Sequence, residues 1–245
     1  MLTAAAVCPH PPLLIPAAIG AAASDPPPAL RAVRDACDVA VGALAAAAPD
    51  LIAVIGGGAA DREYDATAAG SLSEFGVAVM VGEGEPVLPL SLTIGRWLLG
   101  RAGIGAGVDE PGQRPHLLLQ AVDQRASADD CLKLGAAIAE RAPRVALLAM
   151  GDASARRARD IEGAPDPRAQ EYDDEVAEAL AAADARWLGR LDPALDGELM
   201  VAGRAAWQVL AGAAAGTRMC GRLRCMASPY GVTYLVASWE EPRAD

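Results

Sequence analysis

Residues 2–12 read LTAAAVCPHPP, and this stretch sets the architecture of the chain. The run at residues 2–7 is short, apolar and uncharged, which predicts a buried central strand. The prolines after it forbid a helix and predict a rigid loop. That loop places His10 just beyond the carboxyl end of the strand, where open α/β sheets bind their ligands.

Further apolar runs of strand length alternate with helical segments along the rest of the chain. We expect strands at residues 2–7, 51–55, 76–81, 117–122 and 145–150, and a closing pair at 219–228 and 232–239. We expect helices at residues 25–47, 90–99, 127–141, 166–183 and 203–215, a helical region beginning at Asp192, and a loop at 100–112. Asp25 and Ser127 are the expected N-caps of the first and third helices.

Strands that alternate with helices indicate an α/β sheet covered on both faces. The closing pair of strands is joined by a short turn, which indicates an antiparallel edge on a mostly parallel, mixed sheet. No repeat, charge block or linker divides the chain. We therefore predict a three-layer αβα fold in a single domain over residues 1–245.

The composition excludes several classes of partner. Hydrophobic residues make up 53% of the 245 residues, which is typical of a globular protein. The formal net charge of −11 argues against binding to nucleic acid or to anionic membranes. No targeting segment and no apolar run of about 18 residues is present, and the five cysteines form no C-x-x-C pair, so we expect a cytoplasmic protein with reduced thiols.

Unusual residues follow three of the expected strands. These are the CPH segment at residues 8–10, the triple glycine at 56–58 and the GDAS segment at 151–154. Because the carboxyl ends of parallel strands share one edge of a sheet, we expect the three segments to meet in one site. The backbone N–H groups of Gly57 and Gly58 could hold an anion there, or the glycines could serve only a tight turn.

The residues at these strand ends also carry a resemblance to a known family. The matching segments are VCPHPPLLIP at 7–16, LIAVI at 51–55, LLAMGDAS at 147–154, residues 166–175, AGR at 202–204 and SPYGVTYLVA at 228–237. Together they resemble a divergent, actinobacterial-type member of the class III extradiol ring-cleavage dioxygenases, in the catalytic B-subunit superfamily that includes the Memo proteins. The resemblance implies an αβα fold, a homo-oligomer, and Fe(II) held by two histidines and a carboxylate.

The resemblance also shows which of these groups the chain has kept. The first metal histidine of the family matches His10. The second falls at Gly58, and the last ligand, Glu in the dioxygenases and Cys in Memo, falls at Ala202. The acid/base histidine falls at Ala155. Since glycine and alanine offer no side-chain donor atoms, we expect no catalytic iron at the family position and no cofactor.

A polar cluster lies beside the expected site. It contains Asp152, Ser154, Arg156, Arg157 and Arg159. If the segment is helical, Asp152 and Arg156 form an i,i+4 pair. The arginines could replace the lost metal as the electropositive element and bind a carboxylate or phosphate, or they could form only a solvated, salt-bridged turn.

Two further residues are candidates for lining a ligand site. Arg204 follows the lost ligand position, and because a buried, unpaired arginine is costly we expect it to have a partner such as Asp152. Tyr230 lies in the Pro-Tyr-Gly turn between the closing strands. It could line the site or only fix the turn.

These residues leave three functional hypotheses. The first is a superfamily member without the iron site that binds a small, possibly anionic metabolite or a protein partner in the old cleft. The second is an enzyme, either an oxygenase whose metal site recruits His10, His116 and Asp61 or Asp152, or a metal-free hydrolase or lyase using Ser154, Asp152 and His10. The third is a structural or assembly protein.

Overall fold

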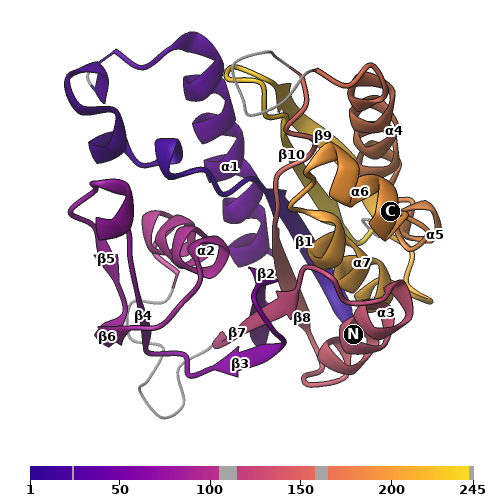
Figure 1. The fold of residues 1–245 in the computed structure, drawn as a ribbon. Coiled ribbons are helices and arrows are strands. Elements are labelled where there is room, and N and C mark those ends of the chain that lie inside the picture. The colour runs from indigo at the N-terminus through magenta and orange to yellow at the C-terminus, as the bar shows by residue number, and fades with distance from the viewer. Residues whose placement is uncertain (24, 105–114, 158–164, 243–245) are drawn as a thin grey trace.

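The computed structural model describes residues 1–23, 25–104, 115–157 and 165–242. Its centre is a seven-stranded sheet in the order β3-β7-β2-β8-β1-β10-β9 (Figure 1). The strands are β1 (Leu2–Cys8), β2 (Leu51–Gly58), β3 (Arg62–Tyr64), β7 (His116–Asp123), β8 (Val145–Met150), β9 (Cys220–Ala227) and β10 (Tyr234–Glu240). Strands β7, β2, β8 and β1 are parallel, whereas β3, β10 and β9 pair antiparallel at the two sides.

Helices cover both faces of this sheet. They are α1 (Pro28–Ala46), α2 (Leu90–Arg101), α3 (Ala128–Ala139), α4 (Arg168–Ala182), α5 (Ala185–Leu188), α6 (Pro193–Leu199) and α7 (Arg204–Ala213), with 3₁₀ turns η1 (Pro12–Leu14), η2 (Pro16–Ala23) and η3 (Ser73–Phe75). A small sheet of β4 (Ala68–Ser71), β5 (Met80–Val81) and β6 (Glu83–Pro86) lies beside α2 (Figure 1). The predicted three-layer αβα fold with a mixed sheet is confirmed.

The alternation of side chains along each strand separates two layers of core. Cys8 and Met150 belong to the layer under α1 and α2. Val7 and Ala149 belong to the layer under α3, α4 and α7. Strand β8 is buried on both faces, which explains why its sequence reads as an unbroken apolar run.

The predicted strands and helices are present within a few residues of their expected bounds, with two differences. The expected strand at 76–81 is reduced to β5, because Gly76 has a φ of 71° and the chain turns back so that Leu72 N donates to Val79 O. Asp25 does not cap α1. Pro27 occupies the N-cap, and Asp25 instead pairs with Arg31 at 2.7 Å.

Other expectations are met or fall outside the described residues. Ser127 caps α3 by accepting a hydrogen bond from Asp130 N. Most of the predicted loop at 100–112 lies outside the described residues. None of the helices in the described ranges combines the length and the apolar character needed to cross a bilayer.

Helices α3 and α7 contact each other backbone to backbone. A Cβ placed on Gly135 of α3 would lie 1.9 Å from Val209 O, and one on Gly212 of α7 would lie 2.1 Å from Leu132 O. Both separations are far below van der Waals contact. Glycine at these two positions therefore sets the spacing of the two helices.

Gly135→Ala is expected to lower the free energy of unfolding by roughly 2–4 kcal/mol, because α3 and α7 must separate to admit the methyl group. Gly42→Ala in α1 is the matched control, since a Cβ there meets nothing within 4 Å. The control should gain up to about 1 kcal/mol from helix propensity. Urea denaturation measures both, and a Gly135→Ala variant as stable as the wild type would contradict the close approach.

Candidate functional site

The carboxyl ends of β2, β8 and β1 lie side by side in the sheet. Cys8 pairs with Met150, and both side chains face the layer under α1 and α2. Two residues further along the chain come His10 and Asp152, and the backbone N of His10 donates to the carboxylate of Asp152. Gly58 ends β2, which lies on the other side of β8 from β1.

The antiparallel strand β10 adds a fourth residue to this edge. Val7 of β1 pairs with Ala237 of β10, and beyond that point the charge of Asp152 acts on the hydroxyl of Tyr234. Tyr234 faces the same layer and is buried. We call Gly58, Asp152, His10 and Tyr234 the strand-end site.

His10 is held by the carboxylate of Asp152. The backbone N of His10 donates to Asp152 Oδ1 at 2.8 Å, and its Nδ1 lies 3.7 Å from the same oxygen. The residue is only 8% exposed, and Nδ1 is buried without a hydrogen-bond partner among the described residues. Asp152 therefore joins the ends of β1 and β8 and leaves the imidazole with unused hydrogen-bonding capacity.

Tyr234 was missed by reasoning from the sequence. Burial raises the pKa of its hydroxyl, and the negative charge of Asp152 and the nearby Tyr230 raise it further. The hydroxyl therefore stays neutral and can donate a hydrogen bond. The signal was available, because Tyr234 begins the apolar run that follows the Pro-Tyr-Gly turn.

The expected turn at residues 56–58 is wrong, because the glycines continue β2 and pair with β7. A Cβ on Gly56 would lie 2.5 Å from Ser91 Oγ, and that hydroxyl donates to Gly57 O at 2.7 Å. A Cβ on Gly58 would lie 2.9 Å from the Cβ of Ala121. The glycines thus allow α2 and β7 to pack closely, and binding of a ligand by Gly57 and Gly58 stays a prediction.

The segment after β8 is not helical, which removes the expected i,i+4 pair of Asp152 with Arg156. Its peptide groups pair across to the segment before β10 instead. Ala153 N donates to Thr233 O, and Thr233 N donates to Ser154 O, both at 2.9 Å. Arg159 of the predicted polar cluster lies outside the described residues.

Ser154 belongs to a buried network that does not include His10. Its N and Oγ donate to Asp173 at 2.9 and 2.8 Å, and Thr233 Oγ1 donates to the same carboxylate. Arg157 Nη1 lies 3.6 Å from Asp173 Oδ2. Burial raises the pKa of Asp173, and these hydrogen bonds partly offset that rise. Ser154 therefore anchors the chain rather than forming the expected nucleophile set.

The expected pairing of Arg204 with Asp152 is wrong. Arg204 begins α7, is 3% exposed, and places Nε 3.3 Å from Asp196 Oδ2 of α6. Its Nη1 also donates to Gln208 Oε1 at 2.8 Å and to Ala126 O at 2.9 Å. The guanidinium is therefore enclosed by α6, α7 and the segment before α3. The sequence gave no sign of this pairing, because Asp196 is a single aspartate in a short helix.

Asp196 is a titrating group within this enclosure. Burial raises its pKa to about 6, although Tyr172 and the charge of Arg204 both favour the carboxylate.

Tyr230, which was expected to line the site or fix the turn, lies on the surface with 44% of its area exposed. Its proposed contact with a ligand stays a prediction.

The positions matched to the family metal ligands lie at the strand-end site. His10 and Gly58 belong to it, and Ala202 N donates to Asp152 O at 3.1 Å. Ala155, the position matched to the acid/base histidine, follows Asp152 by three residues, and its N donates to Leu199 O. These positions carry one side-chain donor group, the imidazole of His10.

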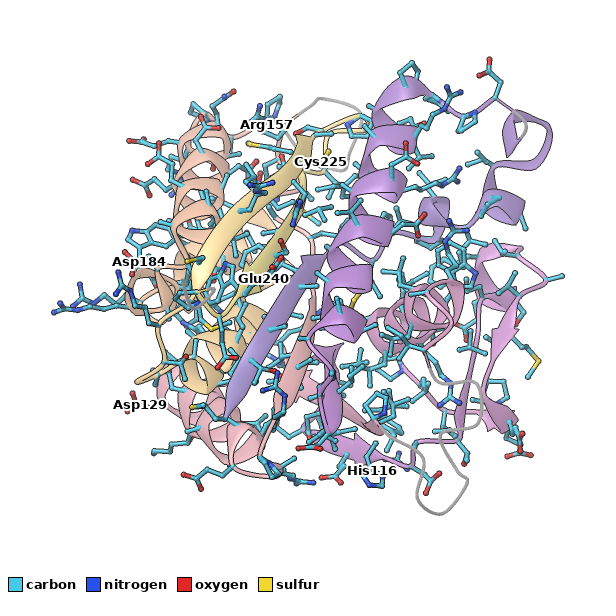
Figure 2. The ribbon with its side chains drawn as sticks, turned by 180° about the vertical axis from the view of Figure 1, so that it is seen from behind. His116, Asp129, Arg157, Asp184, Cys225 and Glu240 are labelled. Atoms are coloured by element: carbon cyan, nitrogen blue, oxygen red, sulfur yellow. The ribbon has the colours of Figure 1, made fainter. Side chains whose placement is uncertain are left out.

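His116 cannot complete a metal site with His10. It is the first residue of β7 and pairs with Leu51 at the amino ends of the strands. About seven residues of strand separate that level from His10, or roughly 23 Å. Figure 2 shows His116 at one end of the sheet and Arg157 at the other. Asp61, the other carboxylate expected in a rearranged metal site, accepts a hydrogen bond from Asp123 N at the end of β7.

The described residues therefore do not fit the Fe(II) centre of the family. Within the described ranges, no group of three or more His, Cys, Asp or Glu side chains is placed to hold a metal ion. Two histidines and a carboxylate are the donors that such iron requires. The strand-end site offers one histidine and one carboxylate.

Comparison with known proteins agrees with the fold and adds no function. No protein-family model and no curated protein matches the chain. The crystal structure of an uncharacterized protein from Escherichia coli K12 is similar, with a TM-score of 0.52 and 13% sequence identity over 97% of this chain and 99% of that one. At this identity the likeness shows the αβα fold alone.

Asp196→Asn is expected to flatten part of the pH dependence of stability. The pKa of about 6 in the folded protein exceeds the ordinary value of 3.8, so the contribution of Asp196 is fully present below pH 3.8 and is lost as the pH rises through about 6. The stability advantage of the wild type over the variant should therefore fall by up to roughly 3 kcal/mol between pH 4 and pH 7. Urea denaturation at several pH values measures this difference.

Exposed Asp129→Asn is the control for that experiment. A difference between Asp196→Asn and the wild type that stays constant from pH 4 to pH 7 would contradict the buried, titrating carboxyl.

Proposed function

We propose that this chain is a divergent member of the class III extradiol dioxygenase superfamily that binds a small, hydroxyl-bearing molecule at the strand-end site without catalytic iron. The observation that carries the proposal is the buried Nδ1 of His10, which has no hydrogen-bond partner among the described residues. An unsatisfied buried polar atom costs about 1–3 kcal/mol. Because that atom is enclosed, a ligand reaches it only when the imidazole turns, and the hydrogen bond formed then recovers that energy.

The resemblance contributes the second argument. Three positions that match family metal ligands, His10, Gly58 and Ala202, are far apart in the sequence. His10 follows β1, Gly58 ends β2, and Ala202 N donates to Asp152 O just after β8. This is the edge at which open α/β sheets bind ligands. The family resemblance further implies a cytoplasmic homo-oligomer, and both remain predictions.

The charges around the site favour a hydroxylated ligand over an anion. Asp152 contributes a carboxylate, which repels anions. The guanidinium groups of Arg157 and Arg204 each lie within ion-pair distance of a buried aspartate. The imidazole of His10 and the hydroxyl of Tyr234 both donate and accept hydrogen bonds, as a bound hydroxyl group requires.

The two enzymatic alternatives have less support. A rearranged metal site would need His116, which lies at the other end of the sheet. A hydrolase based on Ser154 would need that hydroxyl free, whereas it donates to Asp173. Binding of a protein partner and a role in assembly stay open.

Catechol serves as the test ligand, titrated into the metal-free full-length protein by calorimetry. His10→Ala and Tyr234→Phe should each weaken binding roughly two- to tenfold, because each removes one or two hydrogen bonds. His116→Ala is the matched control and should bind catechol as the wild type does. Metal analysis of the purified protein should find iron well below one equivalent.

Several results would overturn the proposal. Stoichiometric iron together with ring cleavage under O₂ would restore the dioxygenase. Equal affinity of wild type and His10→Ala would move the ligand elsewhere. Preference for benzoate over catechol would assign the site to anions.

A further inference from the structure

A cavity lies along the second half of α2, and none of the strand-end residues lines it. Helix α2 begins beside β2, where Ser91 donates to Gly57 O, and it ends beside Leu117 at the start of β7. Ser91 and Arg96, the first residue of α2 that lines the cavity, are five residues apart, about 8 Å along the helix. The cavity has a volume of about 490 Å³, which suits a small molecule.

Much of the cavity wall is apolar. Val81 and Ile104 contribute aliphatic surface from two separate segments, and Leu117 contributes more from β7. Trp97 of α2 adds an indole ring, and the guanidinium carbon of Arg101 lies 5.1 Å from the centre of that ring. A flat apolar group therefore finds an aromatic surface beside a cation.

Arg101 is held in place by Asp38 of α1. Its Nε donates to Asp38 Oδ1 at 3.0 Å, and its Nη2 donates to Oδ2 at 2.6 Å. This pairing raises the pKa of Arg101. The Nη1 group has no acceptor among the described residues, so its N–H groups remain available to a ligand.

A second arginine, Arg96, lines the same cavity. Arg96 donates through Nη1 to Ala66 O, and Arg101 pairs with Asp38, so both guanidinium groups are held at the cavity wall. Neutral apolar ligands need neither cation. Guanidinium groups match carboxylates and sulfonates in charge and in geometry.

We propose that this cavity binds a planar amphipathic anion, whose aromatic body lies against Trp97 and whose carboxylate or sulfonate accepts hydrogen bonds from Arg101 Nη1. The inference stands apart from the strand-end site, because no residue is shared between the two. Asp38 occupies two donors of Arg101 and offsets its charge.

Two fluorescent probes of the same framework test the proposal on the full-length protein. 8-Anilinonaphthalene-1-sulfonate carries the anion, and N-phenyl-1-naphthylamine lacks it. Arg101→Gln should weaken binding of the sulfonate about tenfold through loss of a charge-assisted hydrogen bond, and leave the neutral probe unchanged. Trp97→Ala should weaken both probes.

Asp38→Asn separates ligand binding from a structural role. It removes a negative charge and frees two donors of Arg101, so it should tighten binding of the sulfonate. Exposed Arg125→Gln is the control and should bind both probes as the wild type does. Near-UV circular dichroism confirms that each variant keeps its packed tertiary structure.

The proposal fails if Arg101→Gln binds the sulfonate as tightly as the wild type, or if it weakens both probes equally. It also fails if Asp38→Asn weakens the sulfonate as Arg101→Gln does, because Arg101 would then serve only the fold. Unchanged binding of both probes to Trp97→Ala would place them outside this cavity.

Discussion

Burial of strand β8 on both faces constrains the structure more than any other single feature of the sheet. All six of its residues are enclosed, and it pairs in parallel with β2 on one side and β1 on the other. Because no side chain of β8 reaches water, helices must cover it on both faces. Strands β8 and β1 run in parallel, so both chains leave the sheet at the same carboxyl end. The loops after β1 and β8 therefore meet there, and a hydrogen bond from Gly151 N to Cys8 O joins them.

Two buried carboxylates stabilise the segments around that junction. Asp173 receives hydrogen bonds from Ser154 and Thr233, so it holds the segment after β8 against the start of β10. Asp196 lies against Arg204 and so joins α6 to α7. Such pairs contribute little net stability but are costly to break singly. Their effect is to define one arrangement of the loops around His10.

The sequence predicted the parts of the fold that depend on local pattern. The apolar run at 145–150 and the proline-rich end of β1 could be interpreted residue by residue, because burial and proline geometry act locally. His10 and Asp152 could be placed together since both follow parallel strands. The partners of Ser154 and Arg204 could not, because Asp173 and Asp196 lie on helices whose contacts depend on packing between layers. The triple glycine misled for a related reason, since close packing and a tight turn both require the absence of a side chain.

The contact of Gly58 with β7 limits which residues can replace it. A methyl group at residue 58 would lie 2.9 Å from the side chain of Ala121, closer than two carbons approach in folded proteins. On the proposed descent from a metal-binding ancestor, replacing Gly58 by histidine would require β7 to move or Ala121 to shrink first. The neighbouring strand thus occupies the space that any side chain at residue 58 would need, so a change at this position depends on a change at residue 121.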